Sequence, residues 1–184
     1  KSHATCYSWV AYQTAYIKAH YPAEYMAALM TRRFSQITEI TKLMEECQNM
    51  KIATLGPDVN ESYSKFGVNK KGEIRFGLSA IKGMGEGSAL AIVKEREDHG
   101  PYKDIYDFAE RVDYSNVNRK AFESLALSGG FDSFGFQREQ YLAANQKNET
   151  FLDVLVRYGQ LFQTEQREAQ NSLFGGEQAV EIAR

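Results

Sequence analysis

The segment IKGMGEGSALAIV, residues 81–93, limits the fold of this chain more than any other stretch. It holds three glycines within five positions, and apolar residues follow them at helical spacing. Glycine adopts positive φ angles at no steric cost and presents no side chain to an approaching group. We therefore predict two helical pieces, residues 76–82 and 87–97, joined by a tight turn over residues 83–85.

Apolar residues on both sides of the turn are expected to hold the two helices together. Met84 stands between two glycines and should point between the helices, which would fix the turn. Ala89 is small enough to let the helices approach closely. The residues expected to pack across the pair are Ile81, Ala89, Ile92 and Val93. This pattern is typical of a helix-hairpin-helix element.

The turn is a candidate site for a nucleic-acid backbone. Its N–H groups and the N-terminal end of the second helix form a site that attracts phosphate oxygens. Such contacts read no bases, so we expect binding to double-stranded DNA to be independent of sequence. The predicted DNA-backbone-binding residues are Lys82, Gly83, Met84, Gly85, Glu86, Gly87 and Lys94.

A purely structural turn between two helices is the competing interpretation of the glycines. The phosphate site is favoured because the whole pattern is present, from Ile81 through the second glycine to Ala89 and the apolar pair Ile92–Val93. A dinucleotide site is disfavoured, because no long strand and no βαβ unit surround the glycines.

Composition excludes a strongly basic DNA-binding protein. The net charge is −2 and hydrophobic residues make up 43% of the chain, as in an ordinary globular protein of one large or two small domains. A mild basic bias is local: residues 70–103 hold seven Lys or Arg against five acidic residues.

No apolar run reaches membrane-spanning length, and we expect a cytoplasmic protein without a membrane partner. Cys6 and Cys47 are expected to be buried free thiols, and the histidines lack the spacing of a metal site.

The pattern along the chain predicts a mainly α fold, a small helical bundle with one short β-hairpin and the helix-hairpin-helix element. An extended connector is expected over residues 55–60, and strands 65–68 and 73–76 flank a turn at residues 69–72. No internal repeat of fixed period is evident. Further helices are expected over residues 5–19, 22–33, 37–50, 104–111, 116–127 and 137–145, and an amphipathic stretch over residues 151–162.

Four motifs in order make the chain similar to the alpha subunit of bacterial DNA polymerase III, a C-family replicative polymerase. They are KSHATCYSWVAYQTAYIKAHYPAEYMAALM, PDVNES, IRFGLSAIKGMGEGSALAIV and LALSGGFDSFG. The resemblance covers nearly the whole chain, which opens on a lysine and is expected to be a fragment. It implies the end of a fingers domain (1–55), a connector and β-hairpin (56–76), a duplex-binding helix-hairpin-helix domain (77–148), and an amphipathic segment with a flexible tail (149–184).

The resemblance also implies which chemistry the fragment lacks. Lys1, Ser2 and His3 match a segment that lies near the incoming nucleotide in the family, although they could also be a frayed terminus here. The catalytic aspartates of the family lie in the palm, upstream of Lys1. We therefore expect a fragment with no catalytic residues, metal or cofactor, from a parent DNA-directed DNA polymerase that uses Mg²⁺. The adjacent pair Glu45 and Glu46 is interpreted as a solvated helix face.

The tail carries a second motif that resembles the peptides bound by bacterial sliding clamps. Its residues are Gln170, Asn171, Ser172, Leu173 and Phe174. Leu173 and Phe174 would enter an apolar pocket of the clamp, and Gln170 would add polar contacts. The alternative is that Leu173 and Phe174 pack back onto the domain.

The partners implied are therefore duplex DNA, a sliding clamp and the other subunits of a replicase. Two other classes of function remain open at this point. A self-contained repair nuclease or glycosylase would need a carboxylate cluster or a Lys–Asp pair in a cleft, and no convincing one is found. An interaction scaffold would use the hairpin only as a structural element.

Overall fold

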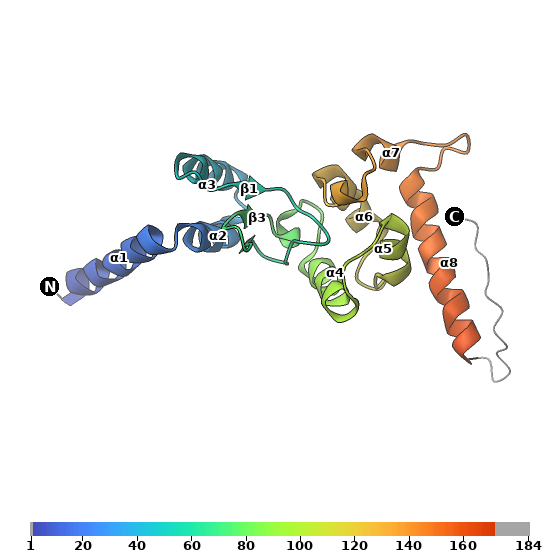
Figure 1. The fold of residues 1–184 in the computed structure, drawn as a ribbon, viewed down its shortest axis with the longest axis horizontal. Helices are drawn as coiled ribbons and strands as arrows, with labels where there is room; N and C mark the ends of the chain where they lie inside the picture. The colour runs from blue at the N-terminus through green and yellow to red at the C-terminus, as the bar shows by residue number, and fades with distance from the viewer. Residues whose placement is uncertain (1, 172–184) are drawn as a thin grey trace.

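The computed structural model describes residues 2–171, which form an elongated, mainly helical molecule with α1 at one end and α8 at the other (Figure 1). The expected fold class is confirmed. The helices are α1 (Ser2–His20), α2 (Pro22–Arg33), α3 (Ile37–Asn49), α4 (Glu86–His99), α5 (Ile105–Arg111), α6 (Arg119–Ser128), α7 (Arg138–Leu142) and α8 (Phe151–Asn171). The strands are β1 (Thr54–Leu55), β2 (Gly67–Val68) and β3 (Ile74–Arg75), and the 3₁₀ turns are η1 (Leu78–Ala80) and η2 (Asp132–Phe134).

Helices α2 and α3 pack with the small sheet around a first hydrophobic core. Pro22 occupies the first turn of α2, where its missing N–H costs nothing. Apolar residues then recur every three or four positions along both helices and meet Phe66 and Ile74 of the sheet region. The buried members of this cluster are Ala23, Met26, Ala27, Met30, Ile40, Leu43, Cys47, Phe66 and Ile74.

The sheet has three strands in the order β1-β3-β2, where the sequence predicted only a hairpin. The hairpin itself is confirmed: β2 and β3 pair antiparallel, and Asn69 Oδ1 accepts hydrogen bonds from the backbone N–H groups of Lys71 and Glu73 in the turn. The addition is β1, which pairs parallel with β3 through Thr54 and Ile74. A two-residue strand has too little periodicity to be recognised beside a proline-containing connector.

Helix α1 is confirmed as a helix, but none of its residues is buried. Cys6 is therefore exposed, which corrects the expectation of two buried thiols, whereas Cys47 is fully buried and both are free. Lys18 near the end of α1 forms an ion pair with Glu46 of α3. No helix within the described residues is long and apolar enough to cross a membrane.

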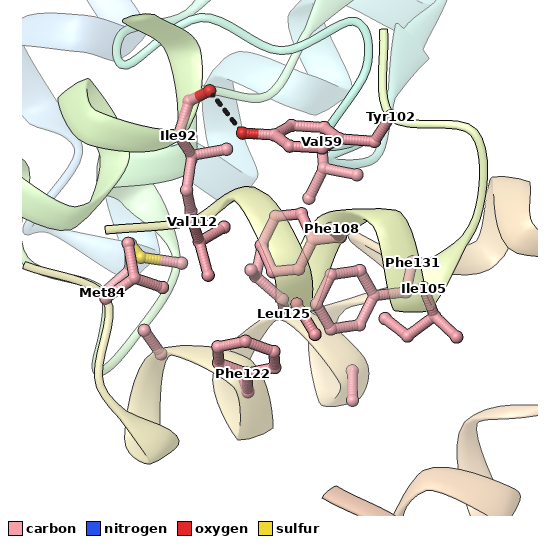
Figure 2. Packing of buried hydrophobic residues seen from close by; sticks show 14 of the residues in the cluster. Val59, Met84, Ile92, Tyr102, Ile105, Phe108, Val112, Phe122, Leu125 and Phe131 are labelled. Carbon is pink, nitrogen blue, oxygen red and sulfur yellow. Dashed lines mark hydrogen bonds between the residues drawn. The ribbon is translucent and has the colours of Figure 1, made fainter. Parts of the chain in front are cut away.

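The larger core lies among α4, α5, α6 and α8 (Figure 2). Phe108 of α5 is at its centre, with ring-centroid distances of 5.2 Å to Phe122 and 5.0 Å to Phe131. The buried Tyr102 hydroxyl donates a 2.9 Å hydrogen bond to the carbonyl of Ile92, which ties the loop after α4 to the same core. This core fixes the positions of α4 and α6 relative to each other.

Local signals explain where the helices of this half begin and end. The side chain of Asp104 caps α5, Asn118 caps α6, and Gly129 ends α6 at φ +89°. Helix α6 thus starts at Arg119, three residues later than predicted. Helix α8 continues to Asn171, well past the amphipathic stretch expected from the sequence.

Candidate nucleic-acid interface

The predicted hairpin turn is present, but the helix before it is only one 3₁₀ turn, η1, where residues 76–82 were expected to be helical. The reason lies at Gly77, whose backbone is extended and packs so closely on residues 64 and 65 that an added Cβ would stand 2.4 Å from the backbone of Lys65. The chain cannot turn into a helix until it has left this contact.

Within the turn, the two glycines have different roles. Met84 N–H donates to Ile81 C=O at 3.0 Å, which closes a β-turn with Gly83 in third position at φ +89°. That angle is the one a type II turn requires there. Gly85 instead has φ −79° and is the N-cap of α4, so positive φ is needed at one glycine only.

The first turn of α4 presents free N–H groups toward solvent. A helix leaves its first four N–H groups without intrahelical partners, and this end carries partial positive charge. Gly85, Glu86 and Gly87 are exposed, and a Cβ added at Gly85 would meet no atom closer than Ser88 Oγ at 3.9 Å. A phosphate can therefore approach the backbone there. Met84, Ile81 and Ala89 are buried beneath the turn, as predicted.

A second hairpin, which the sequence did not suggest, lies between α5 and α6. Asp113 organises it: its backbone carbonyl accepts from Val117 N–H at 2.8 Å, and its carboxylate accepts from Ser115 and Asn116. These hydrogen bonds hold the pKa of Asp113 below its usual value. Val117 is fully buried, and Asn118 caps the helix that follows.

The two hairpins share a burial pattern 33 positions apart, although their turns differ: Gly83 has φ +89°, whereas Asn116 has no positive φ. Gly83–Met84–Gly85 before α4 corresponds to Asn116–Val117–Asn118 before α6, with the buried apolar residue in the middle of each triplet. The same offset relates three further pairs of buried residues within the helices. These pairs are Ala89 with Phe122, Ile92 with Leu125, and Val93 with Ala126.

The hairpins lie side by side. Ser88 Oγ in the first turn of α4 donates a 2.5 Å hydrogen bond to the carbonyl of Asn116 in the second hairpin. In the other direction, a Cβ added at Gly83 would stand 2.7 Å from Ser124 Oγ and 3.4 Å from Lys120 Cε of α6. The N-terminal ends of α4 and α6 thus form one surface.

Exposed lysines surround this surface. Lys82 lies in the turn of the first hairpin, and Lys120 of α6 lies beside that turn. Lys94 follows Gly87 by seven residues, which places Lys94 and Gly87 on the same face of α4. Lys120 and Asn116 were not predicted, and only recognition of the second hairpin would have indicated them. Glu86 adds one exposed carboxylate to the same surface.

Two arginines that contributed to the local basic bias are engaged elsewhere. Arg96 is buried and donates to the carbonyls of Val59 and Ser62, both at 2.8 Å. Arg75 forms an ion pair with Glu61. The free positive charge of this region is therefore carried by lysines.

The other predicted site residues lie apart from the hairpins or outside the described residues. Ser2 and His3 begin α1 at the far end of the molecule, with the His3 ring 4.9 Å from that of Tyr7, and Lys1 lies outside the described residues. Gln170 and Asn171 are the last residues of α8, and Ser172, Leu173 and Phe174 of the same motif fall outside the description. Within residues 2–171, no group of three or more His, Cys, Asp or Glu could hold a metal ion.

Comparison with known proteins agrees with this geometry. A model of the helix-hairpin-helix motif matches residues 51–141. The chain is 46% identical over 148 residues to DNA polymerase III subunit alpha of Pasteurella multocida, covering 80% of this chain and 12% of that protein. The same subunit of Haemophilus influenzae is 41% identical over 175 residues (95% and 14%), and that of Escherichia coli K12 is 43% identical over 138 residues (75% and 12%). The chain thus spans about one eighth of the length of these relatives.

Proposed function

Because this chain is a relative of one section of bacterial DNA polymerase III alpha subunits, as its motifs predicted, we propose that it is the part of a replicative polymerase that holds duplex DNA by its backbone. The single observation that carries the proposal is the pair of adjacent hairpins. Each directs a helix N-terminus toward the same surface, and lysines flank that surface.

Binding through this surface is independent of base sequence. Helix N-termini and lysines recognise phosphate oxygens, which every nucleotide presents alike. Affinity then depends on the release of counterions, so it falls steeply as salt is added. Glu86 opposes binding through its charge, and Glu86→Gln is expected to strengthen it.

The test is a salt titration of duplex binding by fluorescence anisotropy. The variant Gly85→Leu fills the space above the first turn of α4 without backbone strain, since φ is negative and no atom lies close. We expect it to reduce affinity at least tenfold on duplexes of unrelated sequence, on the scale of a lost phosphate contact. Ser133→Leu is the matched control: it adds the same side chain at an exposed residue of η2, beyond the opposite end of α6.

Two results would contradict this proposal. Equal binding by Gly85→Leu and Ser133→Leu would place the DNA elsewhere on the molecule. Strong preference for one duplex sequence at equal length would show that bases are read. Cleavage of the duplex with added metal ion would instead support a self-contained nuclease.

We further propose that nucleotidyl transfer depends on segments outside this chain. The resemblance assigns the catalytic aspartates, with the Mg²⁺ they would hold, to a palm preceding Lys1, and it assigns Lys1, Ser2 and His3 to the neighbourhood of the incoming nucleotide. The 184-residue chain is then expected to bind a primed template without extending it. Incorporation of labelled nucleotides by the purified chain would contradict this assignment.

A tether to a sliding clamp is the second function proposed, on the basis of the motif Gln170–Phe174 and its position after the hairpin region. Leu173 and Phe174 supply the apolar anchors that short peptides use in such pockets. Alanine at Gln170 and Phe174 should abolish capture by an immobilised bacterial clamp and leave duplex affinity unchanged. Unchanged capture would favour the alternative that the two apolar residues pack on the chain itself.

A further inference from the structure

A cleft of about 540 Å³ lies between the β2–β3 hairpin and the segment that precedes it, and none of its lining residues belongs to the two helical hairpins. Its lining includes Lys70 and Lys71, at the exposed tip of the hairpin, together with Tyr63 and Arg75. Its volume accommodates a sugar–phosphate segment. Its chemistry is therefore determined by which of its charges are free.

Both carboxylates that line the cleft already have partners. Glu61 forms an ion pair with Arg75, and Glu73 accepts a 2.8 Å hydrogen bond from Asn69 Nδ2. Within residues 2–171, Lys70 and Lys71 form neither an ion pair nor a side-chain hydrogen bond. The hydrogen bond from Asn69 leaves the charge of Glu73 in place, so the lining carries three cations (Lys70, Lys71, Arg75) and two carboxylates (Glu61, Glu73). The net charge of +1 suits an anion.

Arg75 and Tyr63 provide the cleft with a hydrogen-bond donor and an exposed aromatic ring. Arg75 Nε is buried and has no hydrogen-bond partner within the described residues, although the guanidinium donates to Gly56 C=O at 3.1 Å. The Tyr63 ring has the Arg96 guanidinium 5.6 Å from its centroid, and a Cβ at Gly67 would stand 3.5 Å from the ring. The ring is thereby held in place while 56% of the residue remains exposed.

The cleft is close in sequence to a second cavity that reaches the first helical hairpin. Tyr63 lines the cleft, whereas Lys65, two residues later, lines a neighbouring cavity together with Met84 and Glu86. Since Tyr63 and Lys65 are two residues apart, at most about 7 Å of chain separates the lining of the two cavities.

We propose that this cleft is a further contact for the phosphodiester backbone, with Lys70 and Lys71 as its cations, on the same duplex that the paired hairpins hold. The inference rests on the proposed function, because it takes the duplex to be already bound at the hairpins. It extends the footprint from the hairpins toward the sheet.

The test compares charge-matched variants of the full 184-residue chain on a duplex of about 20 base pairs, which is long enough to span both sites. We expect Lys70→Ala/Lys71→Ala to weaken binding roughly tenfold and to reduce the slope of log affinity against log salt by about 2. The control Lys103→Ala/Lys147→Ala removes the same charge from exposed residues of the loops after α4 and α7, which form no ion pair within the described residues. All four side chains are exposed, so thermal melting curves should be unchanged.

A third variant, Lys82→Ala/Lys120→Ala, separates this inference from the proposed function. If it weakens binding while Lys70→Ala/Lys71→Ala behaves like the control, the hairpins hold the duplex and the cleft does not. If only the cleft variant weakens binding, the cleft contact stands and the hairpin function fails. Absence of duplex binding by the unaltered chain at low salt would overturn both.

Discussion

Tyr141 has a buried hydroxyl group that makes no hydrogen bond within the described residues. The residue is fully buried among Phe131, Phe136 and Phe151. Burial raises the pKa of this hydroxyl far above its ordinary value. The ring is needed for packing, whereas the hydroxyl only adds a desolvation cost.

We predict that Tyr141→Phe raises the free energy of unfolding by about 1 kcal/mol, because it removes an unsatisfied polar group and keeps the ring. Tyr102→Phe is the matched comparison and should lower it by a similar amount, since the Tyr102 hydroxyl does donate to Ile92. Urea denaturation followed by circular dichroism measures both. A loss of stability in Tyr141→Phe would mean that the hydroxyl has a partner after all.

Because of Asp153, the free energy of unfolding should fall as the pH is lowered through the acidic range. The Arg119 guanidinium donates to its carboxylate at 2.8 Å and Thr150 donates to it from both N–H and hydroxyl, which lowers the pKa of Asp153 to about 2. Thr150 Oγ1 accepts from Asp153 N–H in return, so the pair forms a reciprocal cap at the start of α8.

The stabilisation from Asp153 is fully present above its unfolded pKa of about 4. It declines as pH falls toward 2, because the unfolded chain takes up the proton first. Since the side chain is about one-third exposed, the effect should be modest. We predict that Asp153→Asn lowers the urea midpoint at pH 6 and flattens its decline between pH 4 and 2, whereas the control Asp98→Asn on α4 leaves the wild-type slope. An unchanged slope in Asp153→Asn would contradict the assignment.

At the scale of elements, α1 differs from the other long helices because the rest of the described chain buries none of its residues. Trp9, Tyr12 and Tyr16 are each more than half exposed, on a helix that projects from the rest of the molecule. A helix of this composition would normally be covered. Because α1 buries so little apolar surface, we expect it to contribute little to the folding free energy.

We predict that Trp9→Ala leaves the free energy of unfolding within about 0.5 kcal/mol of wild type. Met26→Ala in α2 should lower it by about 2–5 kcal/mol, because Met26 is completely buried. Trp9 is the single tryptophan, so its fluorescence reports on α1 alone and should show a solvent-exposed emission maximum. A blue-shifted emission that moves with protein concentration would instead indicate that α1 pairs between molecules.

The elements that the sequence predicted well are those with long periodic patterns or a strong local signal. Pro22 and the spacing of Met26 and Met30 determine α2, and the glycine turn with Ala89 determines α4. What escaped prediction depends on contacts distant in sequence. The second hairpin has asparagines where the first has glycines, so the sequence does not reveal that the two are similar. The similarity becomes clear in the structure, where Ser88 of one hydrogen-bonds to Asn116 of the other.

At the scale of the whole molecule, Arg96 connects the larger core to the segment that leads to the sheet. It belongs to α4, and its guanidinium donates to the carbonyls of Val59, a member of the larger core, and of Ser62, four residues before Phe66 of the first core. A buried cation is tolerated here because two carbonyls and the Tyr63 ring surround it. The connection fixes the hairpin surface relative to the β2–β3 cleft.

We predict that Arg96→Leu lowers the free energy of unfolding by about 2–3 kcal/mol, since two buried carbonyls lose their donors. Lys94→Leu, on an exposed position of the same helix, should change it little. Hydrogen exchange should show the amides of α2 and α3 losing protection relative to those of α5 and α6. Uniform loss in both halves would mean that the two cores unfold as one unit regardless of Arg96.

The similarity of the two hairpins bears on the direction in which DNA would run across the molecule. If both hairpins hold phosphates alone, as proposed, the chemistry they share does not distinguish one end of the DNA from the other. Asymmetry has to be supplied by features that lie beside one half only. The β2–β3 cleft and its lysines adjoin the first hairpin and not the second, and that one-sidedness would orient the chain on its DNA.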